Sequence, residues 1–204
     1  MDAAATRRLL PPGRNFALVG WLMAALLSGC LGSKNPITPP ETAELDERLL
    51  GAWVTTDLYY QETDYIHVMR RSGGTMNIHE IRYYGDGSGS QSSALGHVSI
   101  LGDRWFLNLQ GPQDAGAQGD APRYTFVAYE FNGRGDLIVH LLSEAAIGEA
   151  FESGHLSGKV DMNPDFVATI VSDDSDRIAE YLQSADTSVL YEREVMFRRI
   201  VPSQ

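Results

Sequence analysis

The sequence contains a single cysteine, Cys30, among 204 residues. One cysteine excludes a disulfide within the chain, and in an exported protein a lone thiol elsewhere would raise the question of a free, reactive group. Cys30 lies instead at the end of an apolar segment near the N-terminus, where a different role accounts for it. We therefore expect neither disulfides nor thiol catalysis in the folded domain.

The sequence also lacks the motifs of common enzyme classes. It contains no Gly-x-Ser-x-Gly nucleophile elbow, no phosphate-binding Gly-Lys-Ser/Thr loop and no dinucleotide-binding fingerprint. His79-Glu80 begins like the metalloprotease HExxH motif, but position 83 is tyrosine and the run alternates like a strand, whereas zinc binding by that motif needs two histidines on one helical face. We therefore expect a protein that is not an enzyme and has no cofactor.

Positive charge is scarce. The chain has 16 Lys and Arg against 27 Asp and Glu, which gives a net charge of −11. An acidic surface repels phosphate backbones and anionic headgroups, so we expect no nucleic-acid partner and no docking on lipid through a basic patch.

No apolar run near the N-terminus is long enough to cross a membrane. Residues 16–27 are almost wholly apolar, but a helix that spans a bilayer needs about 20 such residues. Arg7, Arg8 and Arg14 precede this run and small residues follow it, which is the layout of a secretory signal peptide. The length disfavours the alternative, an uncleaved membrane helix.

The residues Leu27-Ser28-Gly29-Cys30 close this segment and resemble the lipobox of bacterial lipoproteins. The resemblance implies cleavage before Cys30, a diacylglycerol on its thiol and an acyl chain such as palmitate on the new N-terminus, so that residues 1–29 are a lipoprotein signal peptide. Several acyl chains on one residue anchor a protein more stably than one chain, because each buried CH₂ adds ~0.8 kcal/mol. The bilayer is thus the expected partner of Cys30.

Leu31, rather than Asp, follows the cysteine. By resemblance to enterobacterial sorting, this implies the periplasmic face of the outer membrane, with the periplasmic face of the inner membrane as the alternative. Residues 31–41 are rich in Pro, Gly and Ser, which favours an extended, semi-rigid chain. We expect residues 30–48 to be the acylated cysteine and a flexible tether, and residues 49–204 to be the folded domain.

Short β-prone runs separated by turn residues dominate the chain after position 51. About eight such strands with one or two short helices predict a mainly β, antiparallel up-and-down barrel; the alternative is an α+β fold with an open antiparallel sheet. We expect the strands at residues 52–56, 64–70, 75–84, 93–101, 105–110, 124–131, 137–142, 166–171 and 194–201.

Two short helices are expected among the later strands. Ser143 can cap the first, and Gly154 ends it. Ser172 or Ser175 can cap the second, whose apolar side chains recur at helical spacing and face the core: Ile178, Tyr181, Leu182 and Ala185.

A Gly-x-Trp motif, Gly51-Ala52-Trp53, begins the first expected strand, and the last strand contains Arg198 and Arg199. This combination resembles lipocalin-like barrels, in which the tryptophan plugs the base of the barrel and an arginine near the C-terminus lies across it, as a cation–π contact would allow. With the acidic-capped helix before the last strand, the chain is similar to a group of small bacterial outer-membrane lipoproteins of unassigned function. The resemblance implies no catalytic residue and no ligand.

Aromatic residues are the best candidates for a binding site. We expect Tyr59, Tyr60, Tyr83 and Trp105 to line a ligand cavity, because such cavities are mostly apolar. The alternative is a barrel filled by its own side chains, since eight strands enclose little more space than those side chains need.

Four histidines lie on expected strands, namely His67, His79, His97 and His140. They would have to converge inside the barrel to hold a metal ion, and single histidines on strands are ordinary surface or core residues. We therefore expect no metal site.

The expected function is binding of an apolar or amphipathic small molecule by a lipid-anchored, non-catalytic domain that faces the periplasm. The alternative is a protein-interaction module, either a subunit of an envelope complex or an inhibitor of a periplasmic hydrolase. The acidic surface and the Gly-rich loop at residues 111–122 would suit docking to a basic partner. A cavity larger than a water molecule favours the first function, and a large exposed apolar patch favours the second.

Overall fold

The computed structural model describes residues 31–57, 61–111, 124–163 and 166–200, and within these ranges the chain is mainly β. The expected signal peptide, Cys30, Tyr59 and Tyr60 lie outside the described residues, as does most of the 111–122 loop. In the described part of the chain, no helix is both long and apolar enough to cross a bilayer.

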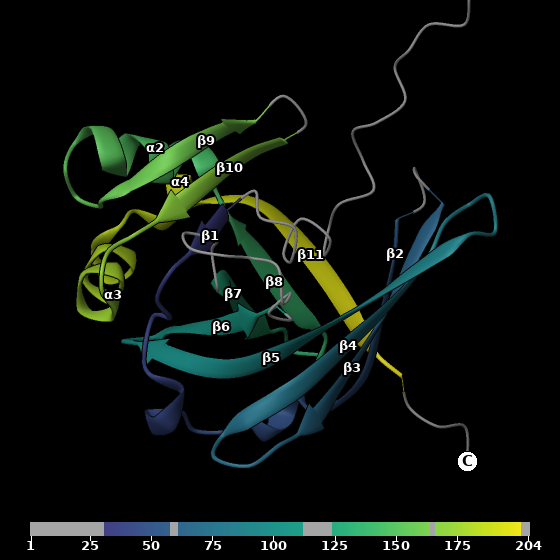
Figure 1. Ribbon diagram of the computed structural model, residues 1–204. Helices are drawn as coiled ribbons and strands as arrows, with labels where there is room; N and C mark the ends of the chain where they lie inside the picture. Colours follow the sequence, from purple (N-terminus) through teal and green to yellow (C-terminus); the bar gives the residue numbers. More distant parts are fainter. Residues whose placement is uncertain (1–30, 58–60, 112–123, 164–165, 201–204) are drawn as a thin grey trace, which may run out of the picture.

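Eight strands close into an antiparallel barrel (Figure 1), as predicted. Each strand from β2 to β7 pairs with the next along the chain, and β11 pairs with both β8 and β2, which closes the circle. The barrel strands are β2 (Gly51–Asp57), β3 (Glu62–Arg70), β4 (Thr75–Tyr83), β5 (Gly89–Leu101), β6 (Arg104–Gln110), β7 (Tyr124–Phe131), β8 (Leu137–Leu142) and β11 (Tyr191–Arg199).

Alternation of side chains explains why these segments form barrel strands. In β4, Met76, Ile78, Glu80 and Arg82 are buried, whereas His79 and the other residues between them are exposed or half-buried. Successive side chains of a strand point to opposite faces, so every second residue of β4 faces the barrel interior. Each of the other barrel strands likewise turns one row of its side chains toward the interior.

The other strands and helices form an outer module on one side of the barrel, at the left of Figure 1. Its strand β1 lies between β7 of the barrel and β10, and its side chains form a second hydrophobic core against the outward-facing Phe106 and Phe126. The outer module consists of β1 (Leu31–Ser33), β9 (Gly158–Asn163), β10 (Phe166–Val171), α2 (Glu144–Glu152), α3 (Ser175–Ser184) and α4 (Thr187–Leu190).

The predicted capping residue is confirmed for one helix and wrong for the other. Ser143 caps α2, since its Oγ accepts a hydrogen bond from the Ala146 amide. Asp174, rather than Ser172 or Ser175, caps α3. The hydroxyl of Ser175 is engaged elsewhere: it donates to the carbonyl of Pro36 at 2.7 Å.

Residues 31–48, expected to form a flexible tether, are instead packed onto the fold. We call residues 31–49 the N-terminal strap. It begins with β1, continues through 3-10 turns at Pro40–Thr42 and Glu47–Leu49, and buries Ile37 to 1% exposure in the second core. Where it passes the β3–β4 turn it leaves no room for a side chain, because a Cβ on Gly74 would lie 2.0 Å from the carbonyl oxygen of Ala43.

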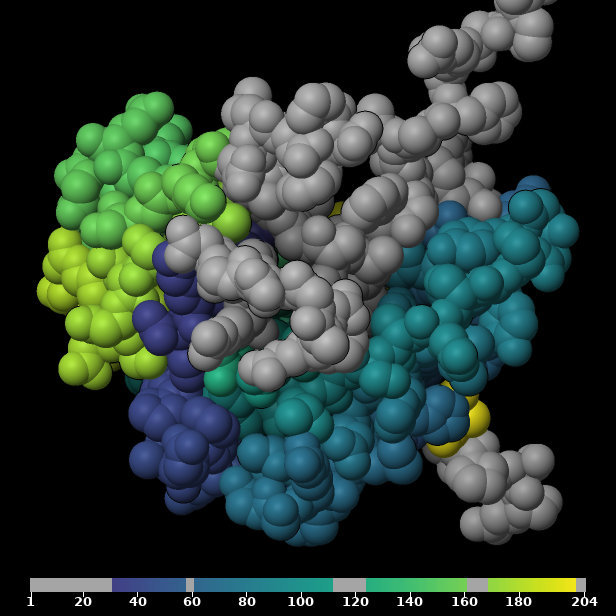
Figure 2. Space-filling model, in the orientation of Figure 1, coloured from purple at the N-terminus to yellow at the C-terminus, as the bar shows by residue number. Residues whose placement is uncertain are grey.

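Hydrogen bonds to β5 and β6 hold the middle of the strap. The Ile37 amide donates to Asn108 Oδ1 at 2.8 Å, the hydroxyls of Thr38 and Ser99 lie 2.6 Å apart, and His97 Nε2 lies 2.9 Å from the Thr38 carbonyl. His97, Ser99 and Asn108 are buried, and buried polar groups require partners. Figure 2 shows the strap, in purple and dark blue, between the outer module and the barrel strands.

We expect acidification to weaken the attachment of the strap. Burial lowers the pKa of His97 below its ordinary value of 6.5, against the opposing effect of the Thr38 carbonyl. The unfolded chain therefore binds this proton more readily, so the free energy of unfolding falls as the pH drops below about 6.5.

The measurement is urea denaturation between about pH 7.5 and about pH 5.5. The pH dependence should be smaller in His97→Gln than in the wild type. His155→Gln, at an exposed histidine, is the matched control and should keep the wild-type dependence. An unchanged dependence in His97→Gln would contradict the assignment.

Candidate functional site

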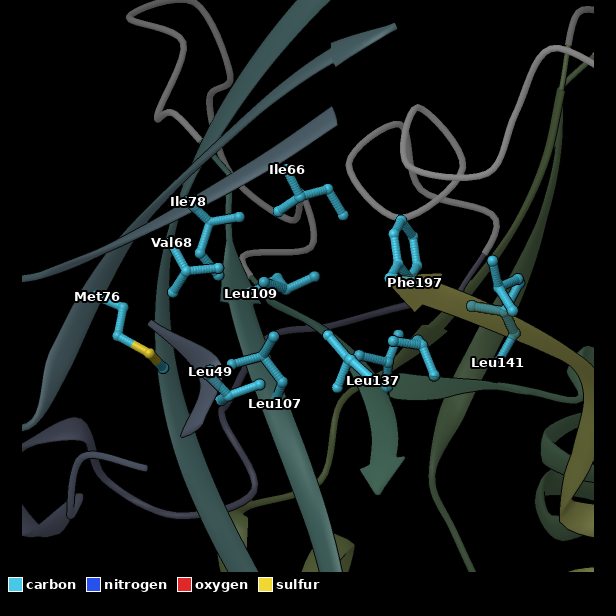
Figure 3. Close-up of a pocket in the computed structure, with 13 residues that line it drawn as sticks. Leu49, Ile66, Val68, Met76, Ile78, Leu107, Leu109, Leu137, Leu141 and Phe197 are labelled. Carbon is cyan, nitrogen blue, oxygen red and sulfur yellow. The ribbon is translucent and has the colours of Figure 1, made fainter. Parts of the chain in front are cut away.

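The barrel encloses a cavity of about 40 Å³ that is lined only by apolar side chains. Figure 3 shows side chains from β3, β4, β6, β8 and β11 turned toward one another around it. A water molecule needs only ~10–15 Å³, so the cavity is larger than one water molecule. The lining includes Ile66, Ile78, Leu107, Leu109, Leu137 and Phe197.

Trp53 belongs to the hydrophobic core inside the barrel, at the end of the barrel where the strap meets β2, which we call the base. It is fully buried, and its indole Nε1 donates to the carbonyl of Leu49, a residue that itself lines the cavity. The guanidinium of Arg199 lies 4.4 Å from the centre of the Trp53 ring. Arg199 also donates to the carbonyls of Leu50, at 2.8 Å, and Arg48. The base therefore joins the first barrel strand, the last strand and the strap.

Only one of the two predicted arginines takes part in this base. Arg198 pairs with Val54, and Arg199 pairs with Trp53. Because neighbouring residues of a strand point to opposite faces, the two side chains diverge, and it is Arg199 that reaches the tryptophan.

A second cation covers another part of the base. The guanidinium of Arg48 lies 4.9 Å from the Trp105 ring centre and 4.8 Å from that of Phe131. Asp46 accepts hydrogen bonds from Arg48, at 2.9 and 2.8 Å, and from the hydroxyl of Tyr129 at 3.0 Å. Burial raises the pKa of the Tyr129 hydroxyl. Burial pushes the pKa of Asp46 upward, but the hydrogen bonds from Arg48 and Tyr129 outweigh it and hold that pKa below its usual value.

An ionic cluster is buried in the wall formed by β3, β4 and β5. Arg82 Nε donates to Asp64 at 2.6 Å, Arg82 also donates to Glu80 at 3.0 Å, and the Ser92 hydroxyl donates to Glu80 at 2.8 Å. All three charged side chains are less than a tenth exposed. Burial raises the pKa of Glu80, although Ser92 and Arg82 oppose it, and two carboxylates share one guanidinium.

The ionic cluster lies on the same inward face as the cavity. Asp64 is two residues from Ile66 on β3, and Glu80 is two residues from Ile78 on β4. Both isoleucines line the cavity. The interior of this wall is therefore apolar near the base and ionic toward the β2–β3 and β4–β5 turns.

The two predicted aromatic residues that the structure describes, Tyr83 and Trp105, do not line the cavity. Tyr83 is 52% exposed on the outer face of β4, because it follows the inward-facing Arg82, and its ring contacts Tyr65. Trp105 faces inward but lies under Arg48 at the base. Neither lines the cavity, and Tyr59 and Tyr60 lie outside the described residues.

The histidines do not converge inside the barrel. His67 and His79 lie on the outer face of β3 and β4, His97 lies under the strap, and His140 packs against Tyr191. Among the described residues, no group of three or more His, Cys, Asp or Glu is placed to hold a metal ion.

The sequence analysis predicted the role of Arg199, but it missed the ionic cluster and the second cation of the base, Arg48. A signal for the ionic cluster was present, since Met76, Ile78, Glu80 and Arg82 recur at a period of two and must therefore share one face if the segment is a strand. No local signal places Asp46 beside Tyr129, because 83 positions of sequence separate them.

Loss of the buried cation is expected to destabilise the barrel strongly. Arg82→Met leaves Asp64 and Glu80 buried without their counter-ion and should lower the free energy of unfolding by about 3–5 kcal/mol in urea denaturation. Adding Asp64→Asn and Glu80→Gln should restore much of that loss. Arg177→Met, which breaks an exposed pair with Glu180, is the matched control and should cost less than about 1 kcal/mol. An equal effect at both arginines would contradict the prediction.

Comparison of the chain with protein-family models, with curated proteins and with solved structures finds no match. The barrel architecture alone does not specify a function, because one fold carries many activities. The function must therefore be argued from the cavity, the charged groups beside it and the outer surface.

Proposed function

We propose that this protein is a membrane-anchored, non-catalytic lipoprotein whose barrel binds one slender aliphatic chain of an apolar or amphipathic small molecule. The observation that carries the proposal is the cavity inside the barrel, which only apolar side chains line. A hydrocarbon chain that enters the cavity contacts apolar side chains and separates no polar group from its partner. Each CH₂ that it buries there contributes about 0.8 kcal/mol.

The size of the cavity selects a narrow ligand. Pockets for drug-sized molecules measure roughly 300–1,000 Å³, whereas this cavity measures about 40 Å³. A linear chain end needs less width than a ring system, and its entry requires fewer side chains to move. Met76 lines the cavity, and its flexible thioether side chain adapts to gaps of different shape.

The ionic cluster favours an amphipathic ligand over a purely apolar one. A chain in the cavity would have its other end beside Asp64, Glu80 and Arg82. Since two carboxylates already share this guanidinium, an anionic head group would compete with them, whereas a hydroxyl or an amine could donate a hydrogen bond to one of them. These charged groups bind one another, which supports a structural role for them and a non-catalytic domain.

The lipid anchor is part of the same proposal. The lipobox-like sequence ends at Cys30, and Leu31, the next residue, already belongs to β1 and pairs with Thr169 of β10. Acyl chains on Cys30 would therefore hold the folded domain directly at the membrane surface, with no free spacer. We propose the periplasmic face of the outer membrane, with the inner membrane as the alternative.

Acylation is tested by growing Gram-negative cells that express the full chain with an alkyne analogue of palmitate. Label is expected on the wild-type protein and not on Cys30→Ser, because the thiol is the attachment point that permits processing. Density-gradient separation of the two membranes then assigns the location. An unlabelled wild type, or an equally labelled variant, would refute the anchor.

Ligand binding is tested by calorimetry on residues 31–204, which lack the proposed signal peptide and Cys30, with decylamine, decanol and decanoate, which share one chain and differ in head group. We expect the amine and the alcohol to bind more tightly than the carboxylate. Ile78→Trp fills the cavity and should abolish binding, at a cost of about 1–3 kcal/mol in stability. Ile81→Trp, on the outer face of the same strand, is the matched control and should bind normally. Absence of binding for all three compounds would refute the ligand proposal.

The outer surface supports a second candidate function, an interaction module for a periplasmic protein, such as a subunit of an envelope complex or a hydrolase. The outer face of β3, β4 and β5 carries exposed apolar side chains on both sides of the row formed by His67, His79 and Ser93: Met69 and Leu95 on one side, Ile81 and Tyr83 on the other. If the barrel binds none of the three compounds, this face becomes the better-supported site.

A further inference from the structure

Two histidines face each other across neighbouring strands on the outside of the barrel. In the antiparallel register of β3 and β4, His67 is directly opposite His79. Ile66, Val68 and Ile78 line the cavity, so the histidines next to them point outward, and both are exposed. Directly opposite residues on antiparallel strands have Cβ atoms about 4.5–5.5 Å apart, a separation at which two imidazoles can reach a common point above the sheet.

A third side chain orients one of these imidazoles. Ser93 lies opposite His79 on β5, and its Oγ is 2.7 Å from His79 Nδ1. When Nδ1 carries the proton of the neutral ring and donates it to Ser93, Nε2 holds the lone pair. Histidines that bind metals are oriented in this way, by a hydrogen bond from the nitrogen that does not bind.

We propose that His67 and His79 form a binding site for a divalent transition-metal ion such as Zn²⁺ or Cu²⁺. Neutral imidazole is a preferred ligand of both ions. Since no third His, Cys, Asp or Glu joins the pair among the described residues, water completes the coordination shell, and the ion exchanges with solvent. The site lies on the opposite face of the wall from the cavity and does not depend on the ligand or the anchor proposed above.

Calorimetry with ZnCl₂ on untagged protein comprising residues 31–204, without the proposed signal peptide and Cys30, tests the site. One equivalent of Zn²⁺ should bind, and His67→Ala or His79→Ala should each weaken binding by at least about tenfold. His155 is the matched control: it is exposed, and its Nδ1 lies 2.7 Å from Ser153 Oγ, but it lies in the bend between α2 and β9, outside any strand pairing that could place a second histidine opposite it. His155→Ala should therefore bind Zn²⁺ like the unsubstituted protein.

The Cu²⁺ form supplies a direct readout of the ligands. Its electron paramagnetic resonance spectrum should show coupling to two imidazole nitrogens in the parent protein and to one in either single variant. Ser93→Ala should weaken binding by a smaller factor, and Ser93→Thr, which keeps the hydroxyl, should restore it. Zn²⁺ affinity that is unchanged in the His67→Ala/His79→Ala double variant, or equal losses in His155→Ala, would overturn the proposal.

Discussion

Closure of the barrel depends on a short seam between its first and last strands. β11 meets β2 at two paired positions, Arg198 with Val54 and Arg199 with Trp53, which is the shortest of the eight pairings around the barrel. The guanidinium of Arg199 reinforces this seam, because it lies over the Trp53 ring and also binds carbonyls of the segment before β2. An aromatic face attracts a cation by about 0.5–2 kcal/mol. Without this closure there would be no enclosed interior for the cavity to occupy.

The wall formed by β3 and β4 presents different chemistry on its two faces. Inside, Ile66 and Ile78 line an apolar cavity beside a buried ionic cluster. Outside, His67 and His79 face solvent directly opposite each other. The two-residue period of a strand makes this separation unavoidable, so a ligand in the barrel and a metal ion on its surface would be neighbours without sharing a single side chain.

The N-terminal strap connects the proposed membrane anchor to the core of the domain. It enters the sheet as β1, covers the polar outer face of β5 and β6, and ends at Leu49, which lines the cavity. A force or a displacement at the position of Cys30 would therefore act on the fold itself rather than on a loose linker. The strap is held at Ile37, which is buried in the second core, and at Leu49, which is buried beside the cavity.

The sequence by itself determined the local structure of this protein. Alternating apolar residues and turn signals were sufficient to predict an antiparallel barrel of about eight strands, and Ser143 was recognised as a helix cap, because strand periodicity and capping act between near neighbours. Packing between distant segments was decided only by the tertiary structure. It selected Arg199 over Arg198, buried Ile37 of the expected tether, and left Tyr83 and Trp105 out of the lining of the cavity. These outcomes depend on strand register and on partners dozens of positions away, which no local pattern encodes.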